Sequence, residues 1–427
     1  MIHQNPLTLI TPVKTTMRDK LTDILQKIRL DIEKGLCSDF EKPGTIHYCR
    51  LVILEASYND DKNDSSKPIN LVFSTDYDGN EDEHLAALSS VSASLIDKLY
   101  ECCEGYPLEK DRTPESRKKY LGQWRVKAAS FFAGAPGRSL KQVQQESALR
   151  NYIWEFLKEG SWKNKTAVEV HKAIRQNVYA KPGFEWAKQQ VPVPKLKWMN
   201  FVLLGLILLL LLPITILLLL FVVGWILVLH FFYEKKDTPL GLTPSQIDEN
   251  HVKELEEYED IHNQNQFTQI ITMKPGKVRL LTVNALMLYA KFRVHNEFVY
   301  GKLMGIPTIH FARWLLIDNN KRMLFFSNFD GSWQQYLGDF IDKSGWGLTA
   351  IFGNTENFPK ARYLFWGGAY DEEHFLAWSR YYQIPTQVWY CAYPLLSIKN
   401  INNNTYIRHE LLKDLNEEQA QQFLQRF

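Results

Sequence analysis

The chain has 427 residues, 45% of them hydrophobic and 23% charged, which is enough for two or three globular domains with buried cores. Its formal net charge of +2 argues against a nucleic-acid-binding protein, which would carry a strong basic excess. Five cysteines, including the adjacent Cys102 and Cys103, form no disulfide framework and indicate a reducing compartment; the N-terminus shows no secretory signal.

Residues 10–157 combine helical and strand patterns, with apolar residues spaced either for one face of a helix or as short β-branched runs. These patterns predict, in chain order, a helix at 11–33, a strand at 46–54, a strand that ends in Asp78-Gly79, an amphipathic helix, a strand at 128–133 and a helix at 140–156. A polar insertion at 59–68 lengthens the connection between the first two strands.

A basic linker (158–200), an uncharged apolar run (201–232) and an acidic linker (233–268) form the middle of the chain. As one helix the run would be roughly 48 Å long, against a hydrocarbon core of about 30 Å, while two full spans need about 40 residues. Pro213 favours a bend inside it. Two interpretations remain, a kinked single span and a shallow hairpin that enters and leaves on one side.

The second half, residues 269–396, repeats the pattern of the first. The sequence Ile-His-aromatic-small-Arg occurs at 46–50 and at 309–313, and each copy leads to an Asp-Gly pair, Asp78-Gly79 or Asp330-Gly331. The later elements predicted here are a strand at 363–366, a helix at 371–382 and a strand at 387–393, followed by a tail (397–427) with a short helix.

This organisation predicts an α+β fold made of two tandem ferredoxin-like repeats, of the dimeric α+β-barrel type, with a membrane-embedded helical segment between them. If both repeats close one barrel, both must lie on one side of the bilayer, which favours the hairpin. We expect the soluble parts on the cytoplasmic side.

The repeated His and Arg have two interpretations. In the functional one, His310 is a haem or metal ligand, or a general acid/base. In the structural one it is a buried hydrogen-bonding residue, and Arg313 pairs with a carboxylate. Strand alternation places His310 on the face of Ala312 and Trp314, opposite Arg313.

The Asp-Gly pairs and one further histidine also have structural alternatives. Asp330 could face a cavity as a proton acceptor, salt-bridged to Arg313, or could cap the helix that follows it. His374, in an acidic helical stretch, is either an axial haem ligand or a surface side chain. Zinc-binding, phosphate-binding and serine-hydrolase motifs are absent from the sequence.

The runs Ile-His-Phe-Ala-Arg-Trp (309–314) and Ser-Asn-Phe-Asp-Gly-Ser-Trp (327–333) resemble a little-characterised family of bacterial membrane-associated proteins. That family is grouped loosely with the dye-decolourising peroxidase-like, dimeric α+β-barrel proteins. The resemblance covers most of residues 270–400 and, more faintly, 10–155. It implies a haem cofactor, with His310 or His374 as iron ligand, Asp330 as proton acceptor and Arg313 as stabiliser of a bound peroxide.

The sequence therefore supports two hypotheses of different classes. The first is a membrane-anchored, haem-dependent, peroxidase-like oxidoreductase. The alternative is a non-catalytic membrane-bound binding or scaffolding module that holds an apolar or lipid-derived ligand or a partner protein. Both predict the lipid bilayer as a partner, and neither predicts nucleic acid.

Overall fold

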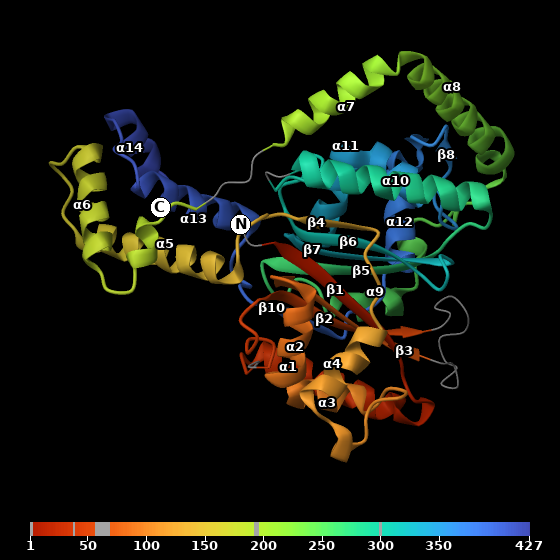
Figure 1. Cartoon of the computed structure of the whole chain (residues 1–427), viewed down its shortest axis with the longest axis horizontal. Coiled ribbons are helices and arrows are strands. Elements are labelled where there is room, and N and C mark those ends of the chain that lie inside the picture. The colour runs from red at the N-terminus through yellow and green to blue at the C-terminus, as the bar shows by residue number, and fades with distance from the viewer. Residues whose placement is uncertain (1–2, 37–38, 56–68, 192–195, 299–300) are drawn as a thin grey trace.

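The computed structural model describes residues 3–36, 39–55, 69–191, 196–298 and 301–427, so the predicted insertion at 59–68 lies outside the described residues. It shows an α+β protein with two four-stranded antiparallel sheets (Figure 1). The first sheet has the order β1 (Gln4–Pro12), β3 (Ile69–Asp78), β2 (Ile46–Glu55), β10 (Val388–Cys391). The second has the order β4 (Ser130–Ala133), β6 (Ile309–Ile317), β7 (Arg322–Asp330), β5 (Gln264–Thr272).

Each sheet takes one edge strand from the distant half of the chain. β10 pairs with β2, with Val388 opposite Leu51, and β4 pairs with β6, with Ser130 opposite Trp314. Both exchanged strands are short. Before each of them the chain runs along the edge strand of the other sheet: Val126 N–H donates to Thr8 O of β1 before β4, and Ile384 N–H donates to Thr268 O of β5 before β10. The two halves therefore share both sheets and form one body.

The sheets face each other across a small aliphatic core, and helices cover their outer faces. The residues between the sheets are Val52, Leu54, Val72, Ile270, Leu315, Ile317, Leu324, Phe326 and Ile384. Helices α1 (Arg18–Glu33), α2 (Glu81–Ser90), α3 (Ala93–Tyr100) and α4 (Pro114–Gln123) cover the first sheet. Helices α10 (Lys277–Asn296), α11 (Trp333–Phe352) and α12 (Glu372–Tyr382) cover the second. The molecule thus has four layers, with buried apolar residues in each of its three interfaces.

Four further helices form an arm at the side of the body (Figure 1). They are α5 (Leu140–Glu159), α6 (Ala167–Ala180), α13 (Ile398–Leu411) and α14 (Glu417–Leu424), and they share a separate apolar core. The predicted basic linker thus contributes α6 to a packed unit, and the tail helix docks against it through Phe423. A short helix, α9 (Glu249–Glu256), belongs to the acidic linker.

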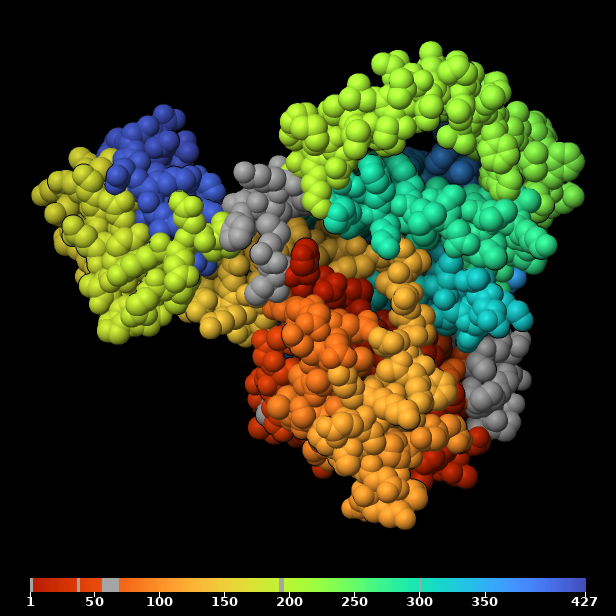
Figure 2. Space-filling model, in the orientation of Figure 1, coloured from red at the N-terminus to blue at the C-terminus, as the bar shows by residue number. Residues whose placement is uncertain are grey.

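The apolar run forms α7 (Trp198–Leu210) and α8 (Leu212–Val228), which meet at a bend beside Pro213. The helical stretch from Leu212 to Lys236 is long and apolar enough to cross a membrane, and only 6% of its most apolar 18 residues are buried. The two helices arch over α10 and leave a hollow beneath them (Figure 2). A core helix of a soluble protein would be buried, so this exposure favours a lipid environment.

The strand predicted at 363–366 is wrong. These residues form the turn between two short strands, β8 (Ala361–Arg362) and β9 (Trp366–Gly367), and Tyr363 and Leu364 have positive φ angles of 50° and 68°. The strand was predicted there because Tyr363, Phe365 and Trp366 are aromatic, and aromatic residues are common in strands. The element that corresponds to β4 is β10, and the helix that corresponds to α5 is α13 rather than α12.

Candidate functional site

Two buried His–Asp pairs lie at matching places in the two sheets. His310 Nε2 lies 2.7 Å from Asp330 Oδ1, and His47 Nε2 lies 3.0 Å from Asp78 Oδ1. Because an ionised carboxylate only accepts, each imidazole donates from Nε2. The structure therefore brings together two of the predicted site residues, His310 and Asp330.

The histidines do not face the way that simple strand alternation predicts. The strand register shifts between Ile309 and Phe311, at His310, in the pairing of β6 with β7. A bulge places two consecutive side chains on similar sides of the sheet. His310 consequently faces the other sheet, with its ring 5.5 Å from that of Tyr48, whereas Trp314 packs under the outer helices. The predicted shared face with Trp314 is wrong for this reason, and the pairing of β2 with β3 shifts in the same way at His47.

Each aspartate uses its second oxygen to hold the start of an arm helix. Asp330 Oδ2 accepts from the Ile398 N–H at 2.9 Å, and Asp78 Oδ2 accepts from the Leu140 N–H at 2.6 Å. A carboxylate is favourable there because the first N–H groups of a helix are free and carry partial positive charge. The aspartates therefore help to cap α13 and α5, beside the N-cap residues Ser397 and Ser139, and not the helices that directly follow them.

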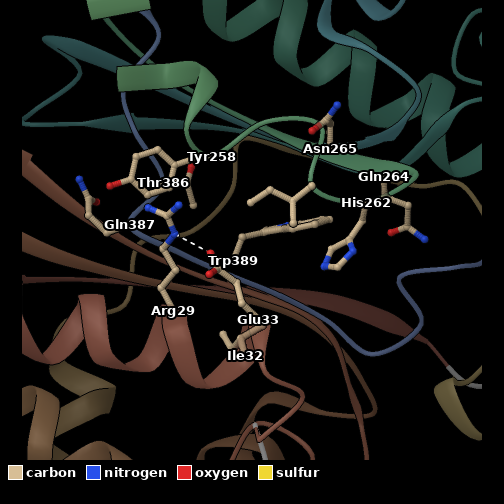
Figure 3. Close-up of a pocket in the computed structure, with 11 residues that line it drawn as sticks. Arg29, Ile32, Glu33, Tyr258, His262, Gln264, Asn265, Thr386, Gln387 and Trp389 are labelled. Carbon is tan, nitrogen blue, oxygen red and sulfur yellow. Dashed lines mark hydrogen bonds and ion pairs between the residues drawn. The ribbon is translucent and has the colours of Figure 1, made fainter. Parts of the chain in front are cut away.

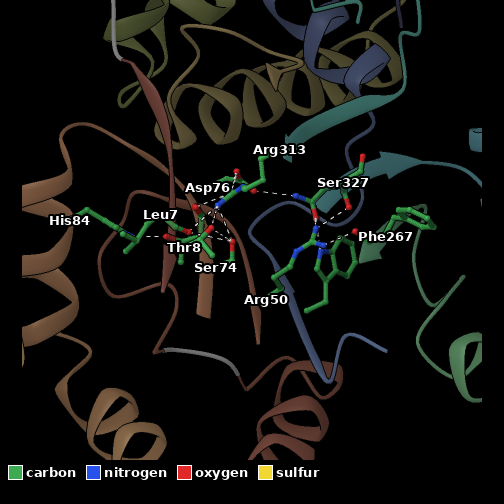
Figure 4. A network of polar contacts seen from close by, with 12 residues as sticks. Leu7, Thr8, Arg50, Ser74, Asp76, His84, Phe267, Arg313 and Ser327 are labelled. Carbon is green, nitrogen blue, oxygen red and sulfur yellow. Dashed lines mark hydrogen bonds and ion pairs between the residues drawn. The ribbon is translucent and has the colours of Figure 1, made fainter. Parts of the chain in front are cut away.

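The third predicted residue, Arg313, crosses to the other sheet (Figure 4). Its ion-pair partner is Asp76, so the predicted pairing with Asp330 is wrong. Its other acceptors are Leu7 O, Thr8 Oγ1, Ser74 Oγ and Thr75 O.

Arg50 makes the reciprocal crossing into the second sheet. Its acceptors are Phe267 O, Thr268 Oγ1, Ser327 O and Asn328 Oδ1. Asn328 also donates to Asp76 Oδ2 at 3.1 Å, so the two crossings form one network. Burial, opposed by Asp76 and reinforced by Arg313, lowers the pKa of Arg50 to about 9. Among the described residues, this network thus contains two guanidinium groups and one carboxylate, that of Asp76, which makes it costly to disturb.

His374 belongs to neither pair. It lies on α12 with its side chain 36% exposed, and its Nδ1 lies 2.8 Å from Asp371. The carboxylate of Asp371 raises the pKa of His374, chiefly through this hydrogen bond. Its surroundings match the surface interpretation of the sequence.

The buried pairs do not fit a haem. His310 is 1% exposed, its Nε2 is bonded to Asp330, and the rings of Tyr48 and Tyr393 lie 5.5 and 6.1 Å away. An axial ligand needs a free ring nitrogen facing an open slot for the macrocycle. The Nδ1 atom of His310 has no hydrogen-bond partner among the described residues, but it is enclosed by these aromatic rings. Within the described residues there is also no group of three or more His, Cys, Asp or Glu side chains that could hold a metal ion.

A small pocket lies between the end of α1, residues 258–265 and residues 386–389, beside Trp389 (Figure 3). Its volume is about 40 Å³, and an ion pair of Arg29 with Glu33 closes one side. Sites for organic ligands have roughly 300–1,000 Å³. This pocket has room for a few water molecules.

Sequence reasoning missed Asp76, Asn328, Tyr393 and His84. Tyr393 lies 2.9 Å from His47 Nδ1, and His84 bonds Thr75 and stacks on Tyr77. Asp76 and Asn328 each stand two residues before an Asp-Gly aspartate, so alignment of the two halves could have singled them out. Tyr393 could not be found in this way, because Ala135 stands at the matching position.

Comparison of the chain with protein-family models, curated proteins and solved structures finds no match.

Proposed function

We propose that this chain is a non-catalytic, membrane-bound binding module made of two ferredoxin-like repeats that close one barrel and hold a lipid-derived ligand. The matched strand orders, the exchanged edge strands and the register shift at each histidine support a duplication. In this proposal the His–Asp and Arg–Asp contacts are structural, and they fix the sheets and the arm.

The contacts of the apolar segment with α10 carry the proposal. At its start, Asn200 Nδ2 donates to Asn296 Oδ1 at 2.7 Å, and near its end Trp225 Nε1 donates to Thr282 Oγ1 at 2.9 Å. Both ends of the segment therefore return to one surface of the body. With 13 residues, α7 is roughly 20 Å long, too short for a hydrocarbon core of about 30 Å.

The segment is accordingly proposed as a shallow hairpin, with the body on one side of the bilayer. The outer face of α10 fits this placement, because Leu281 and Leu288 are 57% and 69% exposed beneath the arch. The cytoplasmic side is proposed because the described cysteines, including the neighbours Cys102 and Cys103, form no disulfide.

The occupied His–Asp pairs favour binding over catalysis. A peroxidase needs an acceptor that can take a proton from bound peroxide. One oxygen of Asp330 is bonded to His310 and the other accepts from the Ile398 N–H, and Arg313 forms its ion pair with Asp76 in the opposite sheet. The haem-dependent peroxidase stays a prediction from the resemblance.

Membrane topology tests the proposal. Single cysteines replace Lys110 in the first half, Glu373 in the second and Leu210 in the arch, all of them exposed in the structure. In sealed vesicles a membrane-impermeant maleimide should label Lys110→Cys and Glu373→Cys from the same side. Leu210→Cys should be protected until detergent is added. Labelling of the two halves from opposite sides would overturn the hairpin.

Absorbance tests the non-catalytic part of the proposal. Protein expressed with added haem and purified in detergent should show no Soret band. A Soret band that His310→Ala or His374→Ala removes would support the oxidoreductase instead.

A further inference from the structure

A cleft of about 950 Å³ lies where the chain passes from the body into α7. One wall comes from β1 and from residues 122–137, and the other from the last turns of α10, including Val294, and from Phe298 just beyond its end. Lys197, the residue directly before α7, closes the cleft on the membrane side. The volume falls within the range of about 300–1,000 Å³ that is usual for organic ligands.

The charged side chains of this cleft are almost all basic. Arg125, Lys127, Lys197 and Lys291 line it, against Glu81 as its only carboxylate among the described residues. Glu81 is already paired with Arg125. Within the described part of the chain, Lys127 and Lys291 have no carboxylate partner. Three lysines therefore face the cleft without a protein counter-charge.

The contact between Lys197 and His295 adds to this imbalance. Lys197 donates to His295 Nε2 at 2.6 Å, so the imidazole is held neutral as an acceptor. Partial burial, followed by the positive charges of Lys197, His3 and Lys291, lowers the pKa of His295. Each charged neighbour that shifts this histidine is basic, so the site favours an anion over a cation.

The position of the cleft, at the start of the apolar segment, indicates that its anion comes from a lipid headgroup. Trp198 and Met199, next to Lys197, are more than half exposed and begin the apolar segment. Lysine followed by tryptophan at the end of an apolar helix is typical of the headgroup level of a bilayer. Basic pockets at this depth bind anionic headgroups, and Phe298 and Val294 offer apolar contacts to the glycerol and upper acyl region.

We propose that this cleft binds the phosphate of an anionic phospholipid, with Lys197 and Lys291 as its principal contacts. The inference rests on the proposed membrane-bound function and names the ligand class for it. The phosphodiester would lie between the two ammonium groups, and its acyl chains would run along α7 into the bilayer.

Lipid retention tests this inference. The full chain is reconstituted into phosphatidylcholine vesicles with or without phosphatidylglycerol and re-extracted in mild detergent, and the phospholipid that stays bound is quantified by mass spectrometry. The wild type should retain phosphatidylglycerol in preference to phosphatidylcholine. Lys197→Gln with Lys291→Gln should lose that preference by about thirtyfold, since each lysine near a membrane surface contributes about 1 kcal/mol and two are removed.

Lys235→Gln with Lys236→Gln is the matched control, because it removes the same charge from the other end of the apolar segment, outside the cleft. The control should retain phosphatidylglycerol like the wild type. An equal loss in both double variants would overturn the cleft and leave only general surface attraction. No loss in the cleft variant would also overturn it.

Two further measurements separate the remaining outcomes. Inorganic phosphate should not displace the bound lipid, and displacement by phosphate alone would show that the site takes a soluble phosphate and would overturn the lipid assignment. If the wild type fails to float with vesicles of either composition, the proposed membrane function fails. If it floats with both but shows no headgroup preference, only the inference fails.

Discussion

Asp76 on β3 and Asn328 on β7 occupy matching positions, each two residues before an Asp-Gly pair, yet only one of them carries a charge. Arg313 crosses between the sheets to Asp76, whereas Arg50 crosses to Asn328, to Thr268 Oγ1 and to backbone carbonyls. The same geometry is thus satisfied by an ion pair on one side and by neutral acceptors on the other. The difference shows that the crossing itself, rather than a second carboxylate, is what both halves require.

The two buried histidines also differ in their hydrogen-bond partners. His47 has a partner on each ring nitrogen, Asp78 and Tyr393, whereas Nδ1 of His310 has none among the described residues because Ala135 stands where Tyr393 stands in the other half. What the halves share is the bond from histidine to the helix-capping aspartate. What they do not share is the outer hydrogen bond, the one that Nδ1 of His47 makes with Tyr393.

Removal of the two arginines in turn gives the largest expected effect. Arg313→Met leaves Asp76 buried without its ion pair and should cost about 3–5 kcal/mol of unfolding free energy. Arg50→Met leaves only neutral acceptors unpaired and relieves its repulsion with Arg313, so about 1–3 kcal/mol is expected. Denaturant unfolding in detergent micelles, followed by tryptophan fluorescence, measures both. Equal costs would contradict the asymmetry.

Exchange of the charged residue between the halves sharpens the comparison. Asp76→Asn alone leaves two buried guanidinium groups without a carboxylate and should cost about 3 kcal/mol. Adding Asn328→Asp returns the carboxylate to the network beside Arg50, and the double variant should recover to within about 1 kcal/mol of the wild type. The same unfolding assay reports the result. A double variant no more stable than the single one would show that the two positions are not equivalent.

The pH dependence of stability separates His84 from its counterpart Tyr336, which stacks on Phe329 as His84 stacks on Tyr77. Burial lowers the pKa of His84 from 6.5 to about 3. Below pH 6.5 the unfolded chain binds a proton that the folded chain does not, so stability falls as the pH falls toward 3. For this group the loss between about pH 7 and pH 5 is about 2 kcal/mol. His84→Tyr, which copies the other half, should flatten the profile over that range, and an unchanged slope would exclude His84 as its source.

The smallest effect concerns the outer hydrogen bond of His47. Tyr393→Phe removes the hydroxyl that lies 2.9 Å from Nδ1 and makes this histidine resemble His310. A cost of about 1 kcal/mol is expected, because one neutral hydrogen bond is lost and the ring contacts remain. Thermal unfolding of the variant beside the wild type measures it. A loss as large as that of Arg313→Met would mean that the hydroxyl does more than complete the histidine.

The sequence predicted the α+β class, the strands β2, β3, β4, β6, β7 and β10 and the apolar segment, because each of these has a clear local pattern. It did not predict β1 or β5, which lie where the sequence indicated the lead-in to a helix and an acidic linker. The pairing of Arg313 with Asp76 could not be predicted, since it joins residues of two different sheets. The orientation of His310 was missed because one bulged residue reverses the alternation. The turn at Tyr363 was missed because aromatic composition is shared by strands and by the β8–β9 hairpin.

The exchange of edge strands has a consequence for how the chain is made. The first sheet lacks β10 until the ribosome has passed residue 391, by which time the apolar arch has already emerged. While the apolar segment at 201–232 is being synthesised, β2 therefore has no edge partner in the first sheet. The first sheet can thus be completed only after the whole apolar segment has left the ribosome.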